Sequence, residues 1–261
     1  MLTIVVDSFD GYSDVWPSFF EIFNMQWGNC PYNVKLVSNY LDFYGVDTIK
    51  VGEETCWSDR TIKAIKQIRT EYVLLLLEDY LFGKSINNEE IAEALVFLKE
   101  RGGQYLRLTN IPKSRFNDGK VFFPLYADEE YAINLQASIW RREFLIEALE
   151  KFPGSAWEFE IGFLKEAVIS KHSILEGCFG AVKDPLDIHN GVLKGKWFPN
   201  EVKYFAKRGI DIQWKERGML TFMQMIKYKI SVGIKDKLSY KTRKKVKSVL
   251  KKFGMRFVSD L

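Results

Sequence analysis

The sequence has little histidine and little cysteine. Its only two histidines are His172 and His189, which excludes a metal site built from several histidines. Its three cysteines, Cys30, Cys56 and Cys178, are widely spaced, odd in number and without a C-x-x-C pair. We therefore expect a reducing compartment and no disulfide framework.

Long apolar runs are also missing, and we expect no targeting segment. No stretch reaches the ~20 apolar residues needed to cross a bilayer. The first residues, MLTIVVDSF, lack a basic n-region, so we expect no signal peptide. What the sequence does have is 47% hydrophobic and 15% aromatic residues over 261 positions, enough for the core of one α/β domain with an appendage.

Charge is divided unevenly along the chain. The whole sequence has 38 Lys and Arg against 34 Asp and Glu, a net charge of +4. Residues 224–256 contain 12 basic residues and one acid, a net +11, which leaves 26 basic and 33 acidic residues, a net −7, elsewhere. We therefore expect a mildly acidic domain over residues 1–215 and a basic tail over residues 216–261.

Extended and helical patterns alternate along the first 110 residues. Strand-like segments are Leu2–Ser8, Asn33–Asn39, Thr48–Gly52, Tyr72–Tyr80 and Gln104–Asn110, and helical patterns begin at Pro17, after an N-cap at Ser58 or Asp59, and at Asn87. This alternation predicts an α/β fold with a mostly parallel open sheet, right-handed crossovers and helices on both faces.

The most informative segment is LLLLEDYLF, Leu74–Phe82, in which an acidic pair ends an apolar run. Such a run predicts a strand buried on both faces. Glu78 and Asp79 would be costly in the core without partners, so we expect them at the carboxyl end of the strand, where open α/β sheets bind ligands. Two carboxylates there suit a divalent cation that carries a diphosphate. The alternative is a strand end with two solvated acids.

Several segments, taken in order, resemble a known family. VDS ends the first strand, WSDR opens a helix, the acidic pair closes a strand, and NLQASIWRREFL, SAWEFE and IHNGVLKGKW follow. Over Leu2–Trp197 this set resembles bacterial glycosyltransferases from capsule, exopolysaccharide and lipopolysaccharide clusters, which have the GT-A fold. The resemblance implies a GT-A-like (Rossmann-like) fold. It also implies transfer of a sugar from a nucleotide-diphosphate sugar to a hydroxyl of a saccharide acceptor, often polyprenyl-linked.

The resemblance implies a donor site around the first strand. It puts the nucleoside against Val6, Asp7 and Ser8, where a carboxylate can accept from a base N–H or a ribose hydroxyl. A turn with side chain-to-backbone hydrogen bonds is the alternative for Asp7 and Ser8. Arg60 is expected to reach the base or the phosphate, whereas Asp59 is expected to cap its helix.

The family's DxD motif falls on Glu78, Asp79 and Tyr80, so its third position is not acidic. The resemblance implies that Asp79 ligates Mg²⁺ or Mn²⁺ and that Glu78 contacts the ribose or a metal-bound water. The metal would be a Lewis acid on the departing diphosphate.

For the segment HNGVLKGKW, the resemblance to GT-A enzymes implies a loop that closes over the donor. His189 in this loop is expected to contact the metal or the diphosphate, and a structural histidine is the alternative. If no metal binds, Lys194 and Lys196 are the expected diphosphate contacts. Gly191 and Gly195 would permit close approach of the backbone.

The resemblance implies that the segment SAWEFE holds the catalytic base. An inverting transfer needs a carboxylate that takes the proton of the acceptor hydroxyl, and Glu158 matches the family position better than Glu160. Trp157 would desolvate that carboxylate or stack on a sugar, and Gln136 and Trp140 would line the acceptor side. The alternatives are an acid-rich first helical turn for SAWEFE, a core position for Trp140, and a retaining mechanism.

The C-terminal pattern is basic and amphipathic. Apolar residues recur every four positions at Phe222, Ile226, Ile230, Ile234 and Leu238, with Lys and Arg on the other faces. This is typical of a helix in an anionic membrane interface, so we expect a cytoplasmic enzyme that is peripheral on the inner face of the membrane. A helix packed on the domain is one alternative.

The second function class is a non-catalytic nucleotide- or nucleic-acid-binding α/β protein whose basic arm grips phosphates. The net charge of −7 outside the tail argues against extended contact with nucleic acid. Release of nucleoside diphosphate from a nucleotide sugar would distinguish a transferase from a binding protein.

Overall fold

The computed structural model describes residues 1–111, 120–126, 131–170 and 174–228. The chain divides into two compact units, residues 1–217 and 218–261. In the second unit the described part is short and helical at residues 222–228. The rest of the expected amphipathic tail lies outside the described residues.

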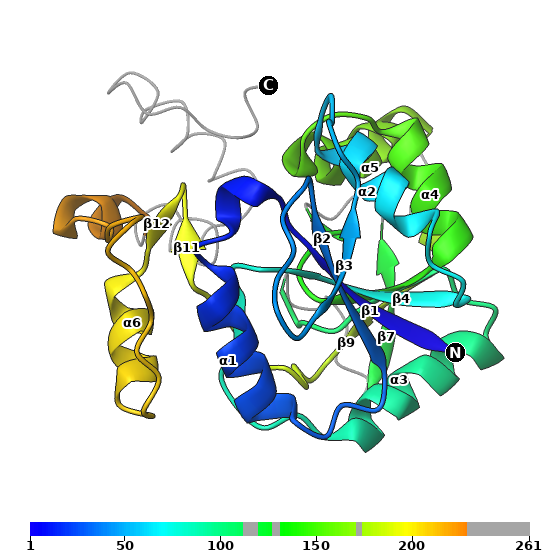
Figure 1. Cartoon of the computed structure of the whole chain (residues 1–261). Helices are drawn as coiled ribbons and strands as arrows, with labels where there is room; N and C mark the ends of the chain where they lie inside the picture. Colours follow the sequence, from blue (N-terminus) through cyan, green and yellow to red (C-terminus); the bar gives the residue numbers. More distant parts are fainter. Residues whose placement is uncertain (112–119, 127–130, 171–173, 229–261) are drawn as a thin grey trace. The chain divides into compact units, whose positions relative to one another are not determined.

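The first unit is built on an eight-stranded sheet with the order β3-β2-β1-β4-β8-β6-β9-β7 (Figure 1). The strands are β1 (Leu2–Asp7), β2 (Asn33–Ser38), β3 (Asp47–Lys50), β4 (Tyr72–Leu77), β6 (Tyr105–Arg107), β7 (Phe122–Tyr126), β8 (Ser138–Arg141) and β9 (Ile174–Ala181). Pairing is parallel among β3, β2, β1 and β4 and between β6 and β9. It is antiparallel where β8 meets β4 and β6, and where β7 meets β9.

Helices cover both faces of this sheet, with α1 and α3 on one side and α2, α4 and α5 on the other (Figure 1). Their bounds are α1 (Trp16–Trp27), α2 (Trp57–Ile65), α3 (Asn88–Glu100), α4 (Arg142–Lys151) and α5 (Ala156–Ser170). The predicted α/β class, with a mostly parallel open sheet and helices on both faces, is confirmed. None of the described helices is long and apolar enough to span a bilayer.

Smaller elements follow the main sheet. The 3-10 turn η1 (Asp10–Tyr12) follows β1, and two short two-stranded sheets pair β10 (Ile188–Asn190) with β5 (Tyr80–Phe82) and β11 (Val192–Leu193) with β12 (Lys196–Trp197). Helix α6 (Pro199–Ala206) comes last in the first unit.

Strand β4 is buried because both of its faces are covered. Val73 and Leu75 pack with Val5 of β1 in the core cluster beneath α2, α4 and α5. Leu74 and Leu76 of the same strand are also fully buried. This continuous burial confirms the two-sided strand that the apolar run predicted.

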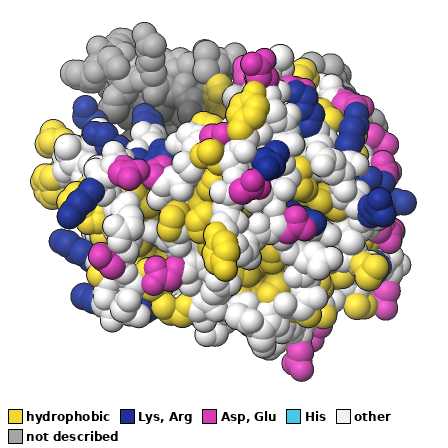
Figure 2. Space-filling model, in the orientation of Figure 1, with side chains coloured by type: hydrophobic (Ala, Val, Ile, Leu, Met, Phe, Trp, Pro, Cys, Tyr) yellow, Lys and Arg dark blue, Asp and Glu magenta, His cyan; other side chains and the backbone are white. Residues whose placement is uncertain are grey.

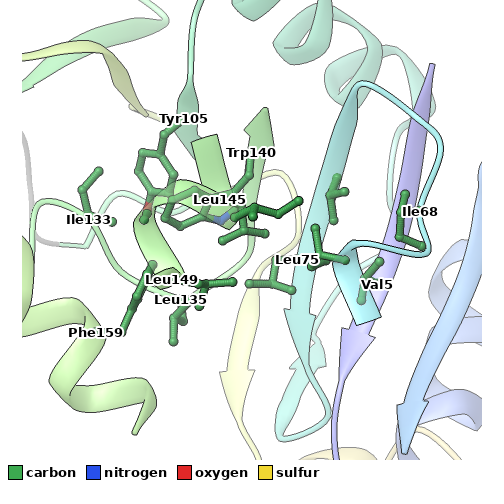
Figure 3. Packing of buried hydrophobic residues seen from close by; sticks show 14 of the residues in the cluster. Val5, Ile68, Leu75, Tyr105, Ile133, Leu135, Trp140, Leu145, Leu149 and Phe159 are labelled. Carbon is green, nitrogen blue, oxygen red and sulfur yellow. The ribbon is translucent and has the colours of Figure 1, made fainter. Parts of the chain in front are cut away.

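Trp140 of β8 lies in the middle of that core (Figure 3). It is fully buried, its ring meets that of Tyr105 edge to face at 4.4 Å, and its Nε1 donates to Ser138 Oγ at 2.8 Å. A residue with these contacts cannot line an acceptor site, so the core alternative holds for Trp140. Truncation of such a residue to alanine typically costs about 3–5 kcal/mol.

The N-cap of helix α2 lies two to three residues before the expected position. Its first residue is Trp57 and its N-cap is Cys56, not Ser58 or Asp59. Ser58 Oγ instead accepts from the backbone N–H of Gly154 at 2.9 Å, and Asp59 accepts from the backbone N–H of Thr55 at 3.1 Å. Ser58 thus serves a tertiary contact that the local pattern does not reveal.

Candidate functional site

The candidate site lies at the carboxyl ends of the parallel strands. Asp7 at the end of β1 pairs with Leu77 at the end of β4, so the acidic pair that follows Leu77 emerges beside the loop after β1. Gln136 lies at the same edge, because Leu75 pairs with Ser138 at the start of the antiparallel β8. This edge is where open α/β sheets commonly bind ligands.

Asp7 and Arg60 bind each other at this edge. Asp7 is buried, and its carboxylate accepts from Arg60 Nε at 3.4 Å and from Thr61 Oγ1 at 2.8 Å. Arg60 also donates from Nη1 to Glu54 Oε1 at 2.9 Å. Burial lowers the pKa of Arg60, but the carboxylates of Asp7, Glu54 and Glu78 outweigh it and raise the pKa overall. The pair therefore fixes α2 to β1 with a permanently charged guanidinium.

Val6 and Ser8, the other residues expected at the nucleoside, are inside the fold. Val6 is fully buried in β1. Ser8 is also buried, and its Oγ accepts from Trp16 Nε1 at 2.7 Å. These contacts tie the loop after β1 to the start of α1.

Glu78 and Asp79 are an acidic pair in a poorly solvated position. Glu78 is 6% exposed, and burial together with the neighbouring charges of Asp79 and Asp7 raises its pKa well above the usual range. Burial raises the pKa of Asp79 to about 7, against a smaller opposing effect of Arg217. Asp79 Oδ1 is buried and has no hydrogen-bond partner among the described residues. A buried acceptor of this kind suggests a ligand that supplies positive charge.

The two carboxylates fit a divalent cation that receives its other ligands from a substrate. Within the described ranges, no group of three or more His, Cys, Asp or Glu side chains could hold a metal ion. Mg²⁺, however, is usually held by one or two carboxylates together with phosphate oxygens and water. The acidic pair, with the unpartnered Asp79 Oδ1, provides that donor set.

Tyr80 connects the acidic pair with α5. Its pKa is raised well above the usual range, first by burial and then by the charges of Asp79 and Glu160, and its hydroxyl hydrogen-bonds Gln136. Glu160 Oε1 accepts from the backbone N–H of Leu135 at 2.7 Å, in the segment that leads to Gln136. Glu160 and the acidic pair therefore both raise the pKa of Tyr80, although they are about 80 residues apart in sequence.

Glu158 faces solvent and caps its own helix. Its Oε2 accepts from the backbone N–H of Ser155 at 2.7 Å and from Ser155 Oγ at 2.8 Å, and its own N–H donates to Ser155 Oγ at 3.2 Å. These hydrogen bonds lower the pKa of Glu158, first through the Ser155 backbone. The geometry is a capping box, which favours the helix-start alternative for Glu158 over general-base chemistry. Trp157 beside it is half-buried, and its buried Nε1 has no partner in the described part of the chain.

His189 lies in β10 and makes its contacts with α6. Its Nδ1 is 2.6 Å from Glu201 Oε2, its Nε2 is 3.6 Å from Asp187 Oδ2, and its ring packs on Tyr204 at 4.6 Å. The hydrogen bond to Glu201 raises the pKa of His189 more than burial lowers it. Both ring nitrogens thus face carboxylates other than Asp79. This arrangement favours a structural histidine over a contact with the metal or the diphosphate.

Lys194 and Lys196 belong to the hairpin of β11 and β12. Lys194 has φ = 50° and Gly195 has φ = 73°, the two positive values that a tight two-residue hairpin turn requires. Lys194 is exposed and Lys196 is half-buried. The hairpin follows Gly191, whose N–H donates to the backbone oxygen of Asp79 at 2.7 Å.

Sequence reasoning missed Arg217, which lies beside the acidic pair. Arg217 is within electrostatic range of Glu78 and Asp79. The two carboxylates raise the pKa of Tyr12 and the guanidinium lowers it. Its Nε donates to Asp14 Oδ2 at 2.9 Å. No motif surrounds Arg217 in the sequence, and 138 residues separate it from Asp79, so only the fold reveals the contact.

No family model matches the sequence, and no curated protein matches it. Among solved structures the chain is similar to S. aureus TarS 1-349, with 15% identity and a TM-score of 0.39. That similarity covers 69% of this chain and 60% of the TarS chain, so the chain spans about 60% of the length of that protein.

Two further similarities have comparable scores. One is to glucosyl-3-phosphoglycerate synthase from Mycobacterium tuberculosis in complex with phosphoglyceric acid, with 12% identity, a TM-score of 0.40, and coverage of 69% of this chain and 68% of that one. The other is to CMP:2-keto-3-deoxy-manno-octonic acid synthetase complexed with CTP, with 10% identity, a TM-score of 0.42, and coverage of 69% and 89%. Similarities of this size carry no conclusion about substrate or site, which depend on the residues themselves.

Proposed function

We propose that the chain is a nucleotide-sugar-dependent glycosyltransferase of GT-A-like fold, whose donor binds at the carboxyl edge of β1 and β4. The observation that carries this proposal is the buried, unpartnered Asp79 Oδ1 in an acidic pair that shares the phenol of Tyr80 with Glu160. Glycosyl transfer from a diphosphate uses an acid that can hold a cation and a second carboxylate that can act as a base, and both lie within electrostatic range of Tyr80.

The acidic pair would hold Mg²⁺ or Mn²⁺ in this proposal, with Asp79 as the direct ligand and Glu78 as its neighbour. When bound, the metal supplies Lewis-acid stabilisation of the departing diphosphate. The pair must give up its protons for the metal, because only the carboxylate form is a ligand. His189 is not included, since its ring nitrogens face Glu201 and Asp187.

Glu160 is the base in this proposal, in place of Glu158. Glu160 lies on the side of α5 that faces Tyr80, whereas Glu158 is exposed and engaged with Ser155. In an inverting transfer, Glu160 takes the proton of the acceptor hydroxyl as its oxygen bonds to the anomeric carbon. The bond from that carbon to the diphosphate breaks, and the diphosphate leaves with the electron pair.

The acceptor in this proposal is a saccharide hydroxyl. Gln136, which hydrogen-bonds Tyr80, and Trp157, whose indole Nε1 has no partner among the described residues, would line the acceptor side. The sequence resemblance supports a polyprenyl-linked acceptor in cell-surface polysaccharide synthesis. The basic composition of residues 224–256 supports attachment to an anionic membrane surface.

A thermal-shift screen of UDP-, GDP- and dTDP-sugars, with and without Mn²⁺, tests the proposal. A ligand that binds only the folded state raises the melting temperature, so one donor should stand out and its shift should grow with Mn²⁺. Asp79→Asn should abolish the Mn²⁺-dependent part of the shift. Asp59→Asn is the matched control, because Asp59 pairs with Lys63 on α2 and should keep the full shift. A flat panel for the wild-type protein would contradict the proposal.

A further inference from the structure

The geometry points to Arg217 as a residue that binds the diphosphate of the nucleotide donor. This inference rests on the proposed function and adds a specific residue to it. Nothing in the sequence motifs marks Arg217, and the inference depends on how the fold holds its guanidinium.

The guanidinium of Arg217 is fixed in position by the loop after β1. Its centre lies over the ring of Tyr12 at 3.9 Å, which sets the plane of the group. Nε donates to Asp14 Oδ2 at 2.9 Å, and Nη2 donates to the backbone oxygen of Gly11 at 2.7 Å and to Asp14 Oδ1. The side chain is only 12% exposed, so little conformational entropy remains to be lost when a ligand binds.

One edge of this guanidinium remains available. Nη1 donates to none of the described residues, whereas Nε and Nη2 are both used. A side chain on Gly195 would begin 3.8 Å from Nη1, so the β11–β12 hairpin, which carries Lys194 and Lys196, turns beside that edge. This edge of the guanidinium therefore lies at the turn of the hairpin between Lys194 and Lys196.

Arg217 is near the acidic pair but is not bonded to it. The charges of Arg217, Glu78 and Asp79 act on one another, yet Arg217 pairs with Asp14 and leaves Asp79 Oδ1 without a partner. A divalent ion and a diphosphate together carry the charges that complement a buried carboxylate and a nearby guanidinium. A divalent ion at Asp79 and a diphosphate between the ion and Arg217 would supply the missing contacts.

The chemistry of arginine suits this position better than that of lysine. A planar guanidinium donates in a fork that matches two phosphate oxygens, whereas an ammonium acts as a point charge. Arg217 is therefore expected to contribute to binding of the diphosphate and to contribute nothing to binding of the nucleoside.

Isothermal titration of the full chain with UDP, GDP, uridine and guanosine, in the presence of Mg²⁺, tests this assignment. Arg217→Gln should weaken binding of the nucleoside diphosphate by about 10- to 100-fold, the loss expected for a charged hydrogen bond to a buried partner. Binding of the matching nucleoside should change less than about twofold. Arg208→Gln is the control, and it should bind both ligands as the wild type does. Arg208 also stacks on a tyrosine ring, that of Tyr204 at 3.5 Å, and donates to the backbone oxygen of Tyr204.

Each outcome decides the assignment. Unchanged binding of the diphosphate by Arg217→Gln, or an equal loss for nucleoside and diphosphate, would overturn it, and the second result would indicate a purely structural role in the Tyr12 loop. If Arg217→Gln does not fold, Arg217→Lys decides, because it keeps a cation for Asp14 but loses the fork. A several-fold loss specific to the diphosphate supports the assignment, and no loss overturns it. If the wild-type chain binds no nucleoside diphosphate, the proposed function fails as well.

Discussion

At the scale of single residues, Glu158 and Glu160 differ in their partners although they are two positions apart on α5. Rotation along a helix is about 100° per residue, so two residues separated by two positions point in different directions. Glu158 turns back to Ser155 at the helix start, and Glu160 turns to the segment before β8 and to Tyr80. The same turn of helix thus holds one structural and one candidate catalytic carboxylate.

We predict that Glu160→Gln and Glu158→Gln separate these roles. Glu160→Gln should lower kcat by about 10²- to 10⁴-fold, the usual contribution of a general base, with little change in donor affinity. Glu158→Gln should retain turnover and lower the melting temperature slightly, because it weakens the cap at Ser155. Steady-state kinetics with melting curves measure both effects. The opposite result, with Glu158→Gln inactive and Glu160→Gln active, would return the base to Glu158.

The pKa of Asp79 predicts a pH dependence of stability. The folded-state pKa of about 7 lies above the usual unfolded value of about 3.9, so the folded state binds more protons between these pH values. Stability of the metal-free protein should therefore fall as pH rises from about 4 to about 7 and level off above. Asp79→Asn should lose less stability over this interval. Melting temperatures at pH 5, 6, 7 and 8 with EDTA test this, and identical slopes for both proteins would contradict the assignment to Asp79.

At the scale of elements, β10 joins the acidic strand end to α6. Leu81 of β5 pairs with His189 of β10, and Tyr204 of α6 donates to the backbone oxygen of Gly83 at 2.9 Å. His189 is central to this packing through Glu201 and Tyr204. The segment after Asp79 is therefore held by contacts that come from more than 100 residues later in the chain.

We predict that His189→Gln affects stability more than ligand binding. Loss of the Glu201 contact and of ring packing on Tyr204 should lower the melting temperature by a few degrees, since about 1 kcal/mol shifts it by 2–4 °C in a chain of this size. The Mn²⁺-dependent shift with the nucleotide sugar should persist. Thermal-shift measurements with and without Mn²⁺ check both statements. Complete loss of the Mn²⁺ effect at normal stability would instead identify His189 as a metal ligand.

The sequence predicted the elements whose cause is local. The apolar run of β4 and its acidic end were predicted correctly, and so was the start of α3, where Asn87 accepts from the backbone N–H of Glu89. The direction of β8 was not predictable, because its short apolar pattern at Ile139 and Trp140 is the same in a parallel or an antiparallel strand.

The site was predictable only in part, for a related reason. Glu78 and Asp79 directly follow the apolar run of β4, so their position at the end of that strand could be predicted from the sequence. The capping box Ser155-x-x-Glu158 could also be recognised locally. The contacts of Asp7 with Arg60, and of Arg217 with Tyr12 and Asp14, join segments far apart in the chain and follow from the fold alone.

At the scale of the whole molecule, charge of both signs is spread over the first unit, whereas the C-terminal segment is basic. Acidic and basic side chains are interspersed on the face in Figure 2. Residues 229–261 contain eleven of the twelve basic residues of segment 224–256, and their structure lies outside the described residues. The two parts are expected to differ in function as well as in composition.

We predict that a chain ending at residue 228 keeps its fold and its nucleotide binding and loses its affinity for anionic membranes. The site lies in the first unit, so the melting temperature and the donor-induced shift should change little. Cosedimentation with vesicles that contain phosphatidylserine should fall to background, and the binding of the full chain should weaken at high salt. Retained vesicle binding by the shortened chain would show that the tail is not the membrane contact.

The central claim is that the acidic pair at the end of β4 serves transfer of a sugar from its diphosphate. The most direct test is phosphorus-31 NMR of the full chain with the nucleotide sugar selected by thermal shift. The buffer contains Mg²⁺ and no Mn²⁺. The account predicts slow release of nucleoside diphosphate by the wild-type chain and none by Asp79→Asn. Release of nucleoside monophosphate and sugar 1-phosphate, or no release from any nucleotide sugar, would contradict it.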